Sequence, residues 1–213
     1  LAQACLAPVE DVDQFLDGVE TEIFKVAESK IRLGFQPIDS LVEKEVGLLE
    51  SIWHREQGRI TGVASGFPDL DQLTAGFQPG DLIIIAARPS MGKTALALNI
   101  AFNAAYHARV PVGFFSLEMS KEQMVRRLLS SEGKIDASHL RRAYFPEPDE
   151  WQRLQEAAGY LLECPIYIDD SPAATVLEVR SKARRLKAEN KLELLIVDYL
   201  QLMRGPRSEN RQV

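Results

Sequence analysis

The sequence predicts an α/β domain with a mainly parallel, doubly wound sheet, preceded by an α-helical segment. Short apolar runs rich in β-branched residues alternate with segments of helical periodicity after residue 61, as in repeated strand–helix–strand units. The runs are nearly continuous in apolar residues, which is typical of parallel strands covered on both faces. Before residue 61 the apolar residues recur only at helical spacing.

Four strands and four helices are expected in this domain. The strands are Leu82–Ala87, Val112–Ser116, Ile166–Ile168 and Leu194–Val197. One helix is Thr94–Tyr106, and the other three follow Ser120, Asp149 and Thr175. Two of these starts have the spacing of a capping box, in which the first residue and the third helical residue cap each other's backbone N–H groups: Ser120 with Gln123, and Thr175 with Glu178.

Two amphipathic helices are expected ahead of this domain. The first runs from Asp11 to Leu33, and the second runs from Ile38 to about Gln57. A single helix cannot bury its apolar stripe by itself, so the second must pack on its own chain, which is the default, or on a neighbouring subunit. We therefore divide the chain into residues 1–33, residues 34–60 and an α/β domain of residues 61–213.

Composition favours a globular protein. The chain has 213 residues, of which 46% are hydrophobic and 26% charged, and it contains no run of about 18 apolar residues that could span a membrane. Cys5 and Cys164 lack metal-ligand spacing and are too few for a disulfide framework, so we expect reduced thiols in a cytoplasmic protein. The net charge of −6 resides in residues 1–60, which leaves the remainder neutral and able to carry a local basic patch.

A phosphate loop follows the first expected strand. The segment fits the pattern G-x-x-x-x-G-K-[ST], with Ala87 in place of the first glycine. In such a loop the lysine contacts the β- and γ-phosphates and the hydroxyl binds Mg²⁺. Gly-Lys-Thr could merely open a helix, but the flanking strand and helix favour a nucleoside triphosphate site. Its residues are Ala87, Arg88, Pro89, Ser90, Met91, Gly92, Lys93 and Thr94.

Such a site also needs a metal-binding carboxylate and a group that activates water. Two expected strands end in Asp, and we prefer Asp198 to Asp169 because its strand has the longer apolar run. Asp169 and Asp170 are better explained as a strand end followed by a turn. Glu118 lies two residues past another strand, at the sheet edge that carries the phosphate loop, where it could polarise the attacking water or be a solvated loop acid.

Six segments of the chain are informative in combination: Thr61–Val63, Gly66–Asp71, Ala87–Thr94, Phe115–Ser120, Ile166–Asp170 and Ile196–Met203. Taken together, they resemble one family, the bacterial replicative DNA helicase DnaB, and the resemblance covers essentially all of residues 61–213. The substitution at Ala87 looks like this family's own form of the loop.

The resemblance implies a RecA-like ATPase that uses ATP and Mg²⁺ and forms a homohexameric ring around single-stranded DNA, unwinding duplex in the 5′–3′ direction at the replication fork. By position, Lys93 and Thr94 would bind phosphate and Mg²⁺, and Asp198 would bind the metal. Glu118 would be the catalytic glutamate, and Gln201 would couple the γ-phosphate to the DNA loops. The ATPase domain would be incomplete at its C-terminus.

The resemblance also implies partners. Residues 38–57 would be a linker helix that docks on the adjacent subunit, and residues 1–33 would end a helical domain that contacts primase. A helicase loader is a further expected partner. Arg204, Arg207 and Arg211 follow Asp198 and would contact DNA phosphates without sequence preference. The alternative is another RecA-like ATPase, a recombination mediator or nucleotide-switched ring protein that does not unwind DNA.

Overall fold

The structure, a computed structural model, describes residue 19, residues 37–53 and residues 60–204. The chain divides into two units, Leu1–Gln57 and Gly58–Val213, which we describe separately. The expected helix at residues 11–33 lies outside the described residues, apart from Val19, which is helical. Among the described residues, no helix combines the length and apolarity needed to cross a membrane.

Nearly all of the described part of the first unit is helix α2, Ile38–Trp53. It confirms the expected second helix, whose last residues, 54–57, lie outside the described ranges. Its described apolar side chains are between 45% and 77% exposed, and the side chain of Ile52, also part of the predicted stripe, lies outside the description. The stripe that the sequence predicts is therefore a solvent-facing surface in this structure, formed by Ile38, Leu41, Val42, Val46, Leu48, Leu49 and Trp53.

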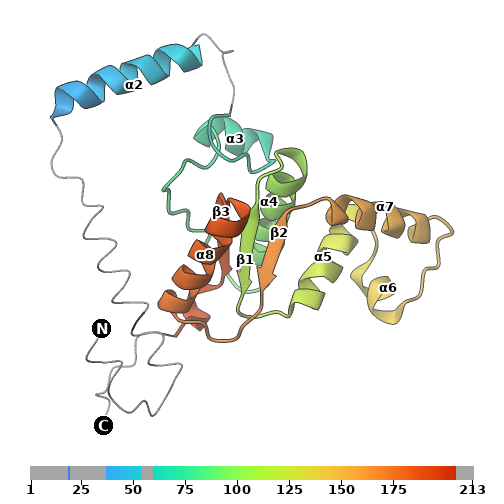
Figure 1. The fold of residues 1–213 in the computed structure, drawn as a ribbon. Coiled ribbons are helices and arrows are strands. Elements are labelled where there is room, and N and C mark those ends of the chain that lie inside the picture. The colour runs from blue at the N-terminus through green and yellow to red at the C-terminus, as the bar shows by residue number, and fades with distance from the viewer. Residues whose placement is uncertain (1–18, 20–36, 54–59, 205–213) are drawn as a thin grey trace, which may run out of the picture. The chain divides into compact units, whose positions relative to one another are not determined.

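The second unit is built on a parallel three-stranded sheet in the order β2-β1-β3 (Figure 1). Strand β1 is Val112–Ser116, β2 is Ile166–Asp169 and β3 is Leu194–Asp198. Three of the four predicted strands are thereby confirmed, within one residue at each end. The central strand β1 is buried along its whole length, whereas the two edge strands are partly exposed.

Helices alternate with the strands, as the sequence predicts. Both capping boxes form, with Ser120 capping α5 and Thr175 capping α8, whereas Asp149 precedes α7 without a side-chain cap. Two short helices, α3 and α6, were not expected, because six or seven residues show too little periodicity. Within residues 60–204, the helices of this unit are α3 Pro68–Thr74, α4 Lys93–His107, α5 Lys121–Gly133, α6 Ala137–Arg142, α7 Glu150–Leu162, α8 Val176–Asn190 and the 3₁₀ helix η2 Leu200–Leu202.

Alternate residues of β1 face two different helix layers, because successive strand side chains point to opposite faces. Val112 and Phe114 pack in a core with α4 and α5, where small residues of α4 such as Ala101 and Ala105 allow close approach to the sheet. Phe115 packs with Val179 of α8 in a second core. Helices cover both faces, so the domain is doubly wound as predicted (Figure 1).

The prediction of a strand at Leu82–Ala87 is wrong for this structure. The segment forms no strand, and its apolar residues Leu82 and Ile84 are 84% and 70% exposed. A strand requires a ladder partner, and in the described residues this run pairs with neither open edge of the sheet, the outer edge of β2 or that of β3. An apolar run shows a tendency to be buried, but it does not show whether the run pairs with a sheet edge.

Hydrogen bonds order residues 61–77, ahead of the phosphate loop, and join them to α4. Asp71 of α3 is 5% exposed and accepts hydrogen bonds from the backbone N–H groups of Ser65 and Gly66, at 2.8 and 3.0 Å. Asn103 of α4 donates to the Ser65 carbonyl at 3.1 Å. These contacts give hydrogen-bond partners to polar groups that burial would otherwise leave unpaired. The bond from Asn103 joins the segment to α4.

Candidate nucleotide-binding site

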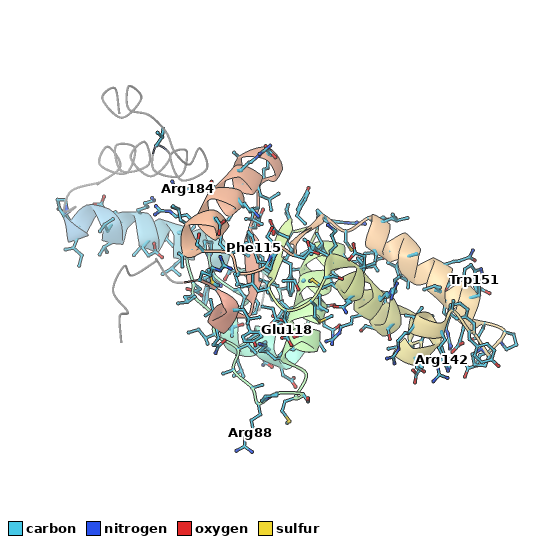
Figure 2. The ribbon with its side chains drawn as sticks, turned by 90° about the horizontal axis from the view of Figure 1, so that it is seen from below. Arg88, Phe115, Glu118, Arg142, Trp151 and Arg184 are labelled. Carbon is cyan, nitrogen blue, oxygen red and sulfur yellow. The ribbon has the colours of Figure 1, made fainter. Side chains whose placement is uncertain are left out.

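The loop before α4 has the shape of an anion site. Gly92 caps the helix with φ 87°, a left-handed conformation that favours glycine, and the first helical residue is Lys93. The backbone N–H groups of the first helical turn have no partner within the helix, and with the helix dipole they attract phosphate. The Arg88 side chain extends away from the sheet (Figure 2), and Met91 is 72% exposed.

Asp198 joins the loop to the sheet. It ends β3 and is 5% exposed, and its two carboxylate oxygens have separate partners. The Lys93 ammonium lies 3.0 Å from Oδ1, and the Thr94 hydroxyl donates to Oδ2 at 2.6 Å. Thr94 and Asp198 are 104 positions apart in sequence, and the parallel topology brings them together because strand ends share one edge of the sheet.

Glu118 lies at the same edge, two residues past the end of β1. The register pairs Ser116 with Asp198 across the two strands, so the turn that carries Glu118 starts beside the Asp198 backbone. Two hydrogen bonds fix this turn: the Ser116 hydroxyl donates to the Met119 carbonyl at 2.7 Å, and the Leu117 N–H donates to the Asp198 carbonyl at 2.8 Å. The Glu118 side chain itself is exposed (Figure 2).

An open cavity of about 1390 Å³ is lined by most of the predicted nucleotide-site residues. The Leu82–Ala87 run and β3 also contribute to its lining. Among the lining residues are Lys93, Thr94, Glu118, Asp198 and Gln201, together with Ala87, Arg88, Pro89, Ser90 and Gly92 of the loop; Met91 is not among them. The fold therefore places the lysine, the hydroxyl and both predicted carboxylates around one cavity.

Some predicted residues lie elsewhere. Arg204 is exposed, and its backbone N–H donates to the Ala174 carbonyl at 3.1 Å, which fixes the chain there without directing the guanidinium to the cavity. Arg207 and Arg211 lie outside the described residues. Gln201 belongs to η2, three residues past Asp198, and is exposed where it meets the cavity.

Asp169 and Asp170 make contacts of a different kind. Burial raises the pKa of Asp169, but hydrogen bonds from Lys182 and Ser171 outweigh it and leave that pKa below its usual value. The backbone N–H of Lys121 holds the pKa of Asp170 down. Both carboxylates thus join β2 to neighbouring helices, in line with the interpretation of these residues as a strand end and turn.

Two residues beside the site were not singled out from the sequence. Tyr199 places its ring under the Lys93 ammonium, with 3.9 Å between Nζ and the ring centroid. Ser116 closes the Glu118 turn. The signal for Tyr199 was its place directly after the strand-ending Asp198, but sequence alone does not show which way a side chain points.

Comparison with known proteins points to one family. The family model described as the DnaB-like helicase C terminal domain matches residues 62–213. Over the whole chain, the sequence is 43% identical to the replicative DNA helicase DnaB of Geobacillus stearothermophilus and 45% identical to the replicative DNA helicase DnaC of Bacillus subtilis (strain 168). The chain spans 47% of the length of each of these relatives.

Solved structures show the same fold. One, described as an ATPase domain, is 35% identical with a TM-score of 0.74, over 84% of this chain and 62% of that one. A DnaB-like replicative helicase, solved in a study of its interactions with primase, is 32% identical with a TM-score of 0.72, over 92% of this chain and 46% of that one. The described α/β unit is thus similar to the ATPase part of such helicases.

Proposed function

Because this chain belongs to the DnaB-like helicase C-terminal domain family, we propose that it is the motor part of an ATP-dependent replicative DNA helicase, which moves 5′–3′ on single-stranded DNA and unwinds duplex at the fork. The observation that carries the proposal is the buried Asp198 carboxylate, which holds Lys93 and Thr94 of the phosphate loop beside the Glu118 turn. A strand-end acid, a loop lysine and hydroxyl, and a second carboxylate are the groups that triphosphate hydrolysis requires.

The residues present fit Mg²⁺ and ATP. Magnesium prefers oxygen ligands and is usually held by one or two carboxylates together with substrate phosphates, and Thr94 and Asp198 offer such oxygens 2.6 Å apart. Bound there, Mg²⁺ would neutralise charge on the phosphates. Lys93 would bind the β- and γ-phosphates, with the remaining loop residues around them, and Glu118 would orient and polarise the attacking water. Gln201 would sense the γ-phosphate.

For DNA binding, we assign Arg204, Arg207 and Arg211 to backbone phosphates. Arg204 is exposed and follows η2, a short distance along the chain from Asp198. A conformational change at the bound nucleotide could therefore be transmitted from Asp198 through η2 to Arg204. Contacts of this kind would be strongly salt-dependent and insensitive to base sequence. The protein would act in the cytoplasm, with primase and a helicase loader as partners, as its relatives' replicative role suggests.

We propose that copies of the chain assemble into a homohexameric ring through the exposed apolar stripe of α2. An amphipathic helix with this much exposed apolar surface gains most by docking on another surface. A neighbouring copy would supply that surface, so that each α2 links two subunits of the ring.

Strand displacement tests the proposed function directly. The full-length protein, with Mg·ATP, is expected to separate a forked duplex that carries a 5′ single-stranded tail. A fork with only a 3′ tail is the control for direction and should stay paired. Efficient DNA-stimulated ATP hydrolysis without any unwinding would contradict the helicase proposal and favour a nucleotide-switched ring protein or recombination mediator.

The ring proposal predicts a large effect of charge on the α2 stripe. Leu49→Glu places a carboxylate in the apolar contact, and leaving such a group without a partner costs about 1–3 kcal/mol per contact, or roughly tenfold to a hundredfold in association. Lys44→Glu adds the same side chain off the stripe and serves as the control. Mass photometry with Mg·ATP should show hexamers for the control and smaller species for Leu49→Glu; hexamers of both at equal concentration would contradict the proposal.

A further inference from the structure

The Lys93 ammonium has two neighbours at the loop. One is the Asp198 carboxylate, at 3.0 Å, and the other is the Tyr199 ring, whose centroid lies 3.9 Å from Nζ. A cation this close to an aromatic face is attracted by the negative charge above the ring. The lysine side chain is 27% exposed, so the pair is partly shielded from water and the attraction is stronger than at a fully exposed site.

We propose that Tyr199 is a positioning residue for Lys93, with its ring holding the lysine ammonium at the phosphate loop while Asp198 exchanges that lysine for the nucleotide's metal ion. The proposal rests on the proposed function, because it assumes that this loop binds Mg·ATP. It goes further by assigning a role to a side chain that carries no charge and that neither the phosphates nor the metal would need as a ligand.

The need for such a residue follows from the contacts of Asp198. Both of its oxygens are occupied, one by Lys93 and one by Thr94. A metal ion that binds this carboxylate competes with the ammonium for the same negative charge. Lys93 must therefore leave Asp198 when Mg·ATP enters, at the moment when its own contact with phosphate is forming.

An aromatic ring suits this step better than a second acid. It attracts the ammonium, but it offers Mg²⁺ no strong ligand and adds no negative charge near the phosphates. A free lysine side chain has several rotatable bonds to be ordered, and the ring limits that freedom before the nucleotide arrives. Tyr199 is also well placed to act with Asp198, because the two are adjacent in sequence and β3 ends between them.

The competing explanation is that Tyr199 only fills space beside the loop. The two explanations differ in what they require of the side chain. Packing requires apolar volume, which leucine supplies in part. Holding a cation requires the electron-rich ring face, which phenylalanine keeps and leucine lacks. Fluorination separates the two most sharply, since 3,4,5-trifluorophenylalanine keeps the shape of the ring and removes the negative charge from its face.

The test is Mg·ATP binding by the full-length protein, measured by isothermal titration calorimetry, with thermal unfolding of each variant as a check on the fold. We expect Tyr199→Phe to bind within about twofold of the wild type, and Tyr199→Leu to bind about three- to thirtyfold more weakly. Replacement of Tyr199 with trifluorophenylalanine should weaken Mg·ATP binding as much as leucine does and leave the unfolding midpoint unchanged. This variant therefore distinguishes the two explanations even if the leucine variant is destabilised.

Equal affinities of the phenylalanine and trifluorophenylalanine proteins would overturn the assignment of Tyr199, whatever the leucine variant does. Failure of the wild type to bind Mg·ATP is a separate result, because it would overturn the proposed function as well. The Lys93→Ala variant tests the nucleotide site without any change at Tyr199. If the loop binds Mg·ATP, this variant should lose binding, and that result stands whether or not the assignment of Tyr199 is correct.

Discussion

The Glu118→Gln variant is expected to bind Mg·ATP as tightly as the wild type and to hydrolyse it about a hundred- to ten-thousandfold more slowly, the range for loss of a general base. Glutamine keeps the size and a hydrogen-bonding oxygen but cannot draw a proton from water. The turn that carries residue 118 should be unchanged, because the two bonds that fix it come from the Ser116 hydroxyl and from backbone groups.

Single-turnover hydrolysis and equilibrium binding of ATP, measured on the same preparation, check this expectation. Glu122→Gln is a matched control, since Glu122 is exposed on the first turn of α5, four residues away, and does not line the cavity. Its hydrolysis rate should stay within about twofold of the wild type, because a solvated surface acid has no role in proton transfer. Weakened ATP binding by Glu118→Gln would instead assign Glu118 a structural role.

The second large effect is expected for Lys93→Ala, which should abolish tight ATP binding and with it turnover. The substitution removes the side-chain cation that the fold places against Asp198 at the loop. Charge-assisted contacts to phosphate contribute about 1.5–3 kcal/mol each, and a lysine at this position serves two phosphates. We expect affinity to fall by at least about a hundredfold.

The Lys93 variant needs a control for stability, because the buried Asp198 then loses one of the two side-chain partners of its carboxylate. Thermal unfolding should show a modest destabilisation, since Lys93 is 27% exposed and water can partly replace it. Lys121→Ala is a matched control: it removes an exposed lysine that pairs with Asp170 at 3.6 Å, outside the cavity. ATP hydrolysis by Lys93→Ala at a rate near the wild type would rule out this loop as the nucleotide site.

Much of the fold could be predicted because it depends on local patterns. Strands β1 and β3 are apolar runs, and the starts of α5 and α8 are marked by pairs of capping residues close together in sequence. The run Leu82–Ala87 has the same local pattern and still forms no strand here. Its pairing depends on which sheet edge lies beside it, and no pattern within the run itself carries that information.

The candidate site was predictable to a similar extent. The spacing of Lys93 and Thr94, the strand end at Asp198 and the position of Glu118 two residues past β1 suffice to place all four at one edge of a parallel sheet. Their contacts were not predictable, because they depend on side-chain direction and distance. The stacking of Tyr199 under Lys93 is of this kind. The roles of Gln201 and of Arg204, Arg207 and Arg211 stay predictions from the family resemblance.

A crystal structure of the full-length Glu118→Gln variant with Mg·ATP tests the central claim most directly. The account predicts the triphosphate in the Ala87–Thr94 loop and Mg²⁺ held by Thr94 and Asp198. Lys93 should have left Asp198 Oδ1, 3.0 Å away without nucleotide, for the phosphates. A triphosphate bound elsewhere, with Lys93 still paired to Asp198, would contradict the account.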